Sequence, residues 1–108
     1  MDAGQRVVEI EQRAVEIEQW DRSHVWHGFT QMAGYDPIVI ERAEGNWLID
    51  VRGRRLLDGV SSLWCIVHGH GHPRIMQAIR DQMELVTHVT SLGMGSATTA
   101  RLAHRLVQ

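Results

Sequence analysis

The sequence contains no lysine, because all 11 of its cationic residues are arginine. Chemistry that needs a lysine amine, such as a Schiff base with a carbonyl cofactor, is therefore excluded from the side chains of these 108 residues. The single cysteine, Cys65, cannot form an internal disulfide, which suits a reducing compartment. We interpret it as a buried structural thiol and expect a cytoplasmic protein.

The sequence also lacks an excess of one charge and long apolar runs. Its formal net charge of -2 gives no electrostatic reason to expect binding to nucleic acid or to an anionic membrane. No stretch approaches the roughly 20 apolar residues that cross a bilayer, and the acidic start is unlike a signal peptide. The hydrophobic content of 44% instead indicates a folded segment with at most one small core.

An acidic leader occupies residues 1–20, and residues 21–108 form one incomplete domain. The leader holds five acidic and two basic residues and repeats Val-Glu-Ile-Glu-Gln at a spacing of seven residues. Ile10, Ala14 and Ile17 recur at helical spacing, so we predict a helix, although the alternation of Val-Glu-Ile-Glu also suits a strand.

Three short β-rich runs follow the leader, at residues 38–40, 47–51 and 55–57, with turns at Gly45 and Gly53 between them. Glycine supplies the positive φ that tight turns need. These runs therefore predict a small antiparallel meander.

The rest of the chain is predicted to be largely helical. A nearly continuous apolar run over residues 61–68 first predicts a buried strand or an extended segment lining a pocket. Helices are expected from Pro73 to Val86 and from Ser96, a good N-cap residue, to Val107. The fold class is thus α+β, a short antiparallel meander followed by helices. The chain ends inside the last predicted helix, so we expect an incomplete domain that is poorly soluble or self-associates.

The histidines and serines are the candidate groups for metal binding and for nucleophilic chemistry. His68, His70 and His72 would project to one side of an extended strand, but two glycines and a following proline indicate a sharp turn, and we expect no physiological metal site. Ser61 and Ser62 lack a Gly-x-Ser-x-Gly elbow, and the sequence offers no evident acid to orient a histidine. A hydrolase triad is therefore excluded.

The sequence holds four tryptophans, which are Trp20, Trp26, Trp47 and Trp64. Taken singly, a tryptophan is more often a core residue than a ligand contact. Trp64 is the exception, because it lies between two serines and a turn rich in glycine and histidine. An aromatic wall beside small polar groups suits an apolar substrate with a polar end.

An ordered series of motifs runs through the chain. Its members are His24-Val25-Trp26-His27-Gly28-Phe29-Thr30-Gln31-Met32, Ala43-Glu44-Gly45, Leu57-Asp58-Gly59, Ser61-Ser62-Leu63-Trp64 and His68-Gly69-His70-Gly71-His72-Pro73. In this order they resemble the start of the 7,8-diaminopelargonate aminotransferases, which are class III aminotransferases. The resemblance covers residues 21–108.

The resemblance implies a pyridoxal-phosphate enzyme that converts 8-amino-7-oxononanoate to 7,8-diaminononanoate for biotin synthesis. The chain would be an N-terminal small-domain segment of a fold-type I α/β enzyme, and the intact enzyme would be a homodimer. Phe29, Leu63 and Trp64 would then bind the small-molecule substrate. Relatives that use S-adenosylmethionine as amino donor commonly carry Tyr and Trp at the positions of Phe29 and Leu63. Relatives that use lysine resemble this sequence more closely, so both donors stay open.

The absence of lysine limits what the chain can do alone. We predict no catalytic, cofactor-binding or metal-binding residue among these 108 residues, and no transaminase activity of the isolated chain. The alternative is a non-catalytic dimerisation or binding module derived from the same segment, with the leader pairing helices. A small metal-binding protein built on the three histidines is the third and least favoured hypothesis.

Overall fold

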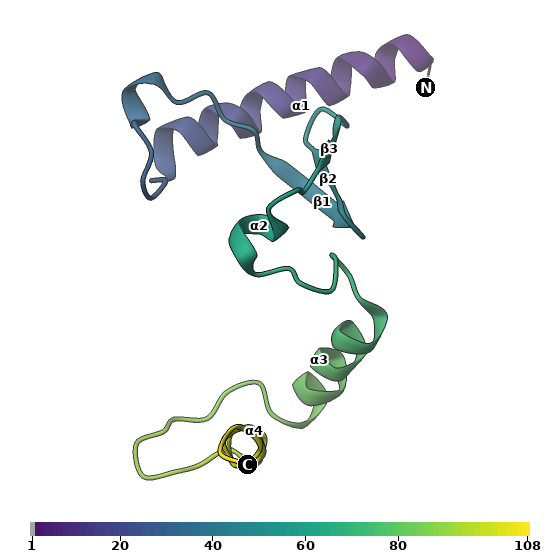
Figure 1. The fold of residues 1–108 in the computed structure, drawn as a ribbon. Helices are drawn as coiled ribbons and strands as arrows, with labels where there is room; N and C mark the ends of the chain where they lie inside the picture. The colour runs from purple at the N-terminus through teal and green to yellow at the C-terminus, as the bar shows by residue number, and fades with distance from the viewer. Residues whose placement is uncertain (1) are drawn as a thin grey trace. The chain divides into compact units, whose positions relative to one another are not determined.

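The computed structural model describes residues 2–108, and these residues form two units. The first unit ends at His72, and the second spans Pro73–Gln108. A long helix and a small sheet make up most of the first unit, and two helices make up most of the second (Figure 1). Among the described residues, no helix is both long enough and apolar enough to cross a membrane.

Residues 3–20 of the leader form most of helix α1, which spans Ala3–His24. Its first turn follows Asp2, whose backbone N–H donates to the Gln5 side chain at 3.1 Å. Arg22 and His24 in the last turn are favourable to the negative end of the helix dipole. The helical alternative for the repeat is therefore the correct one, and the helix continues four residues past the leader.

The three strands form an antiparallel sheet in the order β1-β2-β3. They span Ile40–Glu44, Trp47–Asp50 and Arg55–Leu57. Gly45 has a φ of 56°, as the tight β1–β2 turn requires. The predicted meander is confirmed, but the first run was placed too early. Pairing across this turn fixes the register, and of residues 38–40 only Ile40 belongs to the strand.

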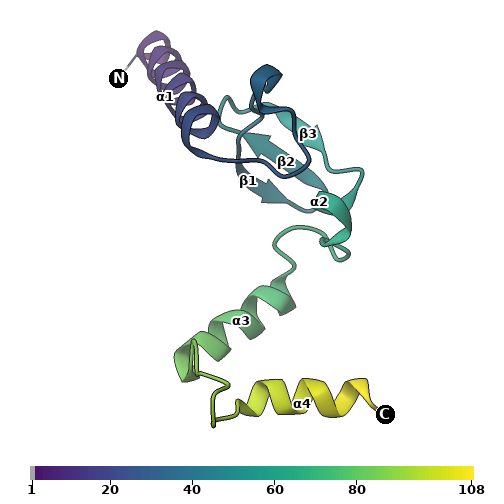
Figure 2. The ribbon, with the colours of Figure 1, turned by 90° about the vertical axis from the view of Figure 1, so that its left-hand side faces the viewer.

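The core of the first unit lies where α1 meets the sheet (Figure 2). Ala14 of α1 is fully buried, and Ile49 of β2 and Val51, which follows the end of β2, are nearly so. Ion pairs between α1 and the turn that follows β2 lie beside this small apolar contact. The Arg52 guanidinium donates two hydrogen bonds to the Glu18 carboxylate, at 2.7 and 2.6 Å, and also pairs with Glu11.

Buried Asp50 organises the turn between β2 and β3. Its carboxylate accepts hydrogen bonds from the backbone N–H groups of Arg52 and Arg54, at 3.0 and 2.8 Å. The Arg54 side chain adds a third bond. Burial by itself raises the pKa of Asp50, but the hydrogen bonds from Arg54 outweigh it and the pKa is lowered. The carboxylate therefore stays charged inside the turn.

The second unit consists of α3, which spans Pro73–Leu85, and α4, which spans Ala97–Leu106. Both predicted helices are confirmed. Ser96 occupies the N-cap position of α4, although its side chain makes no capping hydrogen bond. The hydroxyl of Thr98 donates to the side-chain oxygen of Gln82 at 2.6 Å, which links the two helices. Neither helix contains a buried residue.

Three expectations about burial are wrong. Residues 61–68 form no buried strand but a single turn, α2, at Ser61–Trp64, followed by an exposed loop. Cys65 is exposed rather than buried. The three tryptophans expected in the core are exposed as well. Trp47 is the most covered of them at 40% exposed, with the Arg55 guanidinium 4.7 Å from its ring centre. One helix and three short strands offer too little surface to enclose such large side chains.

Candidate functional site

The α2 turn, Ser61–Trp64, winds in the left-handed sense. Its four residues have φ angles of 52°, 45°, 61° and 70°. This conformation brings the Cβ atom close to the following carbonyl oxygen and costs an L-residue about 1–2 kcal/mol. A bulky residue such as Leu63 or Trp64 is a clear outlier there. Backbone strain of this kind clusters at functional sites, so we call Ser61–Trp64 the left-handed turn and treat it as a candidate.

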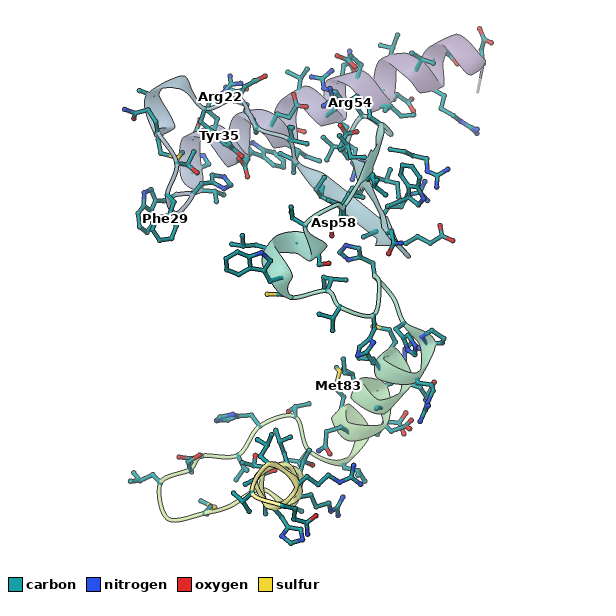
Figure 3. All side chains as sticks on the ribbon, viewed as in Figure 1. Arg22, Phe29, Tyr35, Arg54, Asp58 and Met83 are labelled. Carbon is teal, nitrogen blue, oxygen red and sulfur yellow. The ribbon has the colours of Figure 1, made fainter. Side chains whose placement is uncertain are left out.

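The predicted substrate residues share this unusual backbone. The described residues contain five non-glycine residues with positive φ, and Phe29, Leu63 and Trp64 are three of them. Phe29 has a φ of 57° and a fully exposed ring, which extends away from the ribbon in Figure 3. Leu63 is 67% exposed and Trp64 82% exposed. All three strained side chains therefore face solvent instead of packing in a core.

Each strained turn lies next to a carboxylate–imidazole pair. Near Phe29, the ring N–H of His27 donates to Asp21 of α1 at 2.9 Å, and the His27 ring lies 4.5 Å from that of Tyr35. Next to the left-handed turn, His70 donates to Asp58 at 2.8 Å. These pairs tie loops to α1 and to the sheet. Leu63 and Trp64 share one turn and Phe29 occupies another, and among residues 2–108 no hydrogen bond joins the two turns.

The Asp58 carboxylate accepts three hydrogen bonds beside the left-handed turn. It accepts hydrogen bonds from the Ser62 backbone N–H and the Ser62 hydroxyl, both at 2.8 Å, as well as from His70. These bonds lower the pKa of Asp58 to about 2, the Ser62 backbone contributing most and the His70 side chain next. The Asp58 side chain is only 4% exposed.

The histidine expectations need correction. We predicted that no acid orients a histidine, which is wrong, because Asp58 orients His70. The Ser62 hydroxyl bonds the carboxylate instead of an imidazole, so the geometry lacks the serine–histidine contact that a hydrolase triad needs. Nor do the three imidazoles gather at one point. The His68 and His72 rings lie 5.9 Å apart, whereas His70 is engaged by Asp58.

Sequence reasoning missed Asp58 and His27 as functional candidates. Asp58 entered only as part of a motif, and His27 only as a neighbour of Phe29. No specific signal in the sequence pointed to Asp58, because its bonds to Ser62 are made in the left-handed turn. The partnership with His70, twelve residues further on, depends on the tertiary fold.

The class III aminotransferase family matches residues 30–108, which is more than half of the chain and includes the left-handed turn. The chain belongs to this family. As a family member it is 52% identical, over 97 residues, to the adenosylmethionine-8-amino-7-oxononanoate aminotransferase of Nitratidesulfovibrio vulgaris. That match covers 87% of this chain but only 18% of the relative.

Solved structures agree with the fold class. The crystal structure of adenosylmethionine-8-amino-7-oxononanoate aminotransferase from Methanocaldococcus jannaschii matches with a TM-score of 0.80 and 42% identity. The match covers 86% of this chain and 22% of the chain in that crystal structure. The structure of taurine:2-oxoglutarate aminotransferase from Bifidobacterium kashiwanohense, in complex with PLP and glutamate, matches with a TM-score of 0.78 and 28% identity. That match covers 87% of this chain and 21% of the other chain. The meander followed by helices is thus an N-terminal segment of a transaminase fold, and the chain spans about a fifth of these relatives.

Proposed function

We propose that this chain is the substrate-wall segment of a pyridoxal-phosphate-dependent transaminase that converts 8-amino-7-oxononanoate to 7,8-diaminononanoate in biotin biosynthesis. In this proposal residues 21–108 belong to the aminotransferase domain, and residues 1–20 are an acidic helical leader. The intact enzyme is a cytoplasmic homodimer, and Phe29, Leu63 and Trp64 wall the substrate pocket.

One observation carries the proposal, namely that all three predicted wall residues have positive φ and exposed side chains. An aromatic ring, an aliphatic side chain and an indole together suit the long apolar part of an oxononanoate. The Nitratidesulfovibrio relative, named for this substrate, supports the substrate class.

The residues of the chain do not fit a covalent cofactor site. Pyridoxal phosphate is held by transaminases as a Schiff base on a lysine, and the 108 residues include none. The nitrogen side chains near the left-handed turn are imidazoles, and His70 is already engaged by Asp58. The contribution we assign to this chain is therefore to the substrate, and proton transfer at the reacting carbon lies outside it.

The amino donor is proposed as S-adenosylmethionine or lysine. A phenylalanine at position 29 offers no hydroxyl, and Leu63 offers no indole, so neither side chain supplies a hydrogen bond to a polar donor. Both side chains are apolar, which favours contact with a hydrocarbon chain. The naming of the Nitratidesulfovibrio relative favours S-adenosylmethionine, whereas the identities of these two residues favour lysine.

Binding of 8-amino-7-oxononanoate to the chain, followed by NMR, tests the proposal. We expect resonance shifts at Phe29, Leu63 and Trp64. Trp26 provides a matched control, since it is as exposed as Trp64, at 82%. Trp64→Ala should weaken binding about fivefold, the value of one aromatic contact, and Trp26→Ala should not.

Nonanoate serves as the control ligand, because it has the same chain length without the amine and the ketone. Because the proposed wall side chains contact the hydrocarbon part of the substrate, nonanoate should shift the same three resonances. No response to nonanoate at these residues, or equal losses in the two tryptophan variants, would contradict the substrate wall. Dimers that form through the left-handed turn, without any ligand response there, would favour the binding-module alternative.

A further inference from the structure

The left-handed turn needs support from outside itself. Within it, the Trp64 N–H donates to the Val60 carbonyl, and the N–H groups of Cys65 and Ile66 both donate to the Ser61 carbonyl, all at 2.9 Å. A right-handed turn provides similar bonds without the steric penalty of positive φ. These local bonds therefore do not explain the handedness.

Asp58 supplies contacts that a right-handed alternative would have to give up. One carboxylate oxygen accepts the Ser62 backbone N–H, and the other accepts the Ser62 hydroxyl, both at 2.8 Å. The two bonds fix the backbone and the side chain of the residue just before Leu63. Breaking them would leave a nearly buried carboxylate short of partners, which is costly.

Asp58 is itself anchored to the sheet. Its backbone N–H donates to the Asn46 carbonyl at 2.9 Å, in the turn between β1 and β2. His70, its imidazole partner, exchanges two backbone hydrogen bonds with Gly45 in the same turn, at 2.7 and 3.1 Å. Figure 3 shows Asp58 where the chain passes from the sheet to α2. A continuous set of bonds thus runs from the β1–β2 turn through Asp58 to Ser62.

We propose that Asp58 is a positioning residue that holds Ser61–Trp64 in the left-handed conformation and so sets the direction of Leu63 and Trp64. That these two side chains face a substrate rests on the proposed function, but the positioning does not. The low pKa of Asp58 agrees with this role, because the hydrogen bonds that lower it are those that restrain Ser62.

Amide hydrogen exchange of the full chain tests the proposal. The N–H groups of Cys65 and Ile66 are suitable reporters, since they need the turn but do not touch Asp58. In Asp58→Ala we expect their exchange to speed up about tenfold or more, because a turn released from Asp58 opens as it interconverts between the two helical senses. The Val51 N–H, bonded to the Val39 carbonyl at 3.0 Å, should keep its rate because this bond lies just beyond the ends of β1 and β2 and does not involve the left-handed turn.

A second readout distinguishes positioning from general stability. Scalar couplings and intraresidue HN–Hα distances report the sign of φ, and in Asp58→Ala they should lose the positive-φ signature at Leu63 and Trp64. Asp58→Asn keeps an oxygen for the Ser62 N–H and should retain that signature. Asp36→Ala is the matched control, because Asp36 pairs only with Arg22 in an exposed ion pair among the described contacts.

Unchanged φ signs and unchanged exchange at Cys65 and Ile66 in Asp58→Ala would overturn the proposal. If that variant loses the sheet as well, Ser62→Ala decides, since it removes only the hydroxyl bond. Faster exchange at Cys65 with a protected Val51 then supports positioning, and no change at Cys65 overturns it. Neither measurement uses a ligand, so a failure of the proposed substrate to bind would leave this result intact.

Discussion

Phe29 combines two features that stability alone does not favour. Its backbone lies in the left-handed region, and its ring is fully exposed, so packing against the described residues does not offset the strain. One hydrogen bond spans the turn, from the Thr30 hydroxyl to the Gly28 carbonyl at 3.1 Å. Strain kept at an exposed aromatic residue is expected where the side chain serves binding.

Replacing Phe29 by glycine should therefore separate stability from binding. Glycine adopts positive φ freely, and after its larger entropy loss on folding we expect Phe29→Gly to stabilise the first unit by about 0.5–1 kcal/mol. Binding of the oxononanoate should weaken in the same variant. Urea unfolding followed by circular dichroism measures the stability.

Phe29→Ala is the control for that variant, because alanine removes the ring but keeps the penalty for positive φ. It should weaken binding without stabilising the fold. A Phe29→Gly variant that is less stable than the parent chain would show that the ring makes a stabilising contact.

The proposed wall residues remain a prediction from the resemblance, and their backbone conformation was not predicted at all. Motif resemblance pointed to Phe29, Leu63 and Trp64, but their positive φ could not be read from the sequence, since bulky side chains prefer negative φ. Asp58 was visible only as a motif residue, because its roles depend on contacts with Ser62 and His70 made in the folded chain.

Among the elements, the helices were the most predictable. Apolar side chains at helical spacing identified α1, α3 and α4, because that spacing follows from helix geometry. The run at residues 61–68 misled, since a short apolar run does not specify its conformation. In the folded chain, hydrogen bonds between Ser62 and Asp58 are found at this turn, and the sequence pattern does not reveal them.

Ion pairs as well as a small apolar contact hold helix α1 to the first unit's sheet. Its buried apolar contact centres on Ala14, a small residue, whereas Arg52 binds Glu18 through two hydrogen bonds and also reaches Glu11. The Arg52 side chain is 28% exposed and that of Glu18 16% exposed, so the pair is partly shielded from solvent. The docking of α1 should therefore depend on pH.

We expect acid to weaken this docking through Glu18. The hydrogen bond from Arg52 lowers the pKa of Glu18 below its ordinary value of 4.5. A lowered carboxyl pKa in the folded state adds stability that is fully present above pH 4.5 and is lost as pH falls through the lowered pKa. Glu18→Gln should lose part of this acid-dependent step, and hydrogen exchange of α1 amides at several pH values measures it.

Glu16→Gln is the matched control, because Glu16 is an exposed glutamate on the same helix. Glu41, whose pKa is also lowered through Arg13, remains in both variants and contributes equally to each. An acid response that is identical in Glu18→Gln and in Glu16→Gln would show that Arg52 and Glu18 do not control the docking.

At the scale of the whole molecule, the second unit exposes its apolar side chains. Met83 of α3 is 60% exposed, and Leu102 and Leu106 of α4 are 59% and 76% exposed. Faces of this kind are patterned for burial. The chain spans only about a fifth of its relatives, so further surface of the family fold is available in them to cover these faces. Self-association of the isolated chain remains our prediction.

The lack of lysine predicts how the whole chain responds to pyridoxal phosphate. The side chains include no primary amine, so borohydride treatment should fix the cofactor only on the N-terminal amine. Mass spectrometry of proteolytic peptides locates the adduct, and a lysine-containing protein treated in parallel verifies the chemistry. An adduct within residues 2–108 would mean that the chain has a cofactor site that we have not identified.

The left-handed turn has a consequence for chirality. Its L-residues follow the helical sense that is natural to their mirror images, so a D-residue would be relaxed where Leu63 is strained. Cys65 directly follows Trp64, which makes that peptide bond suitable for joining two synthetic halves by ligation at cysteine. Inverting one stereocentre within this turn would change the strain of the backbone while keeping every side chain chemically the same.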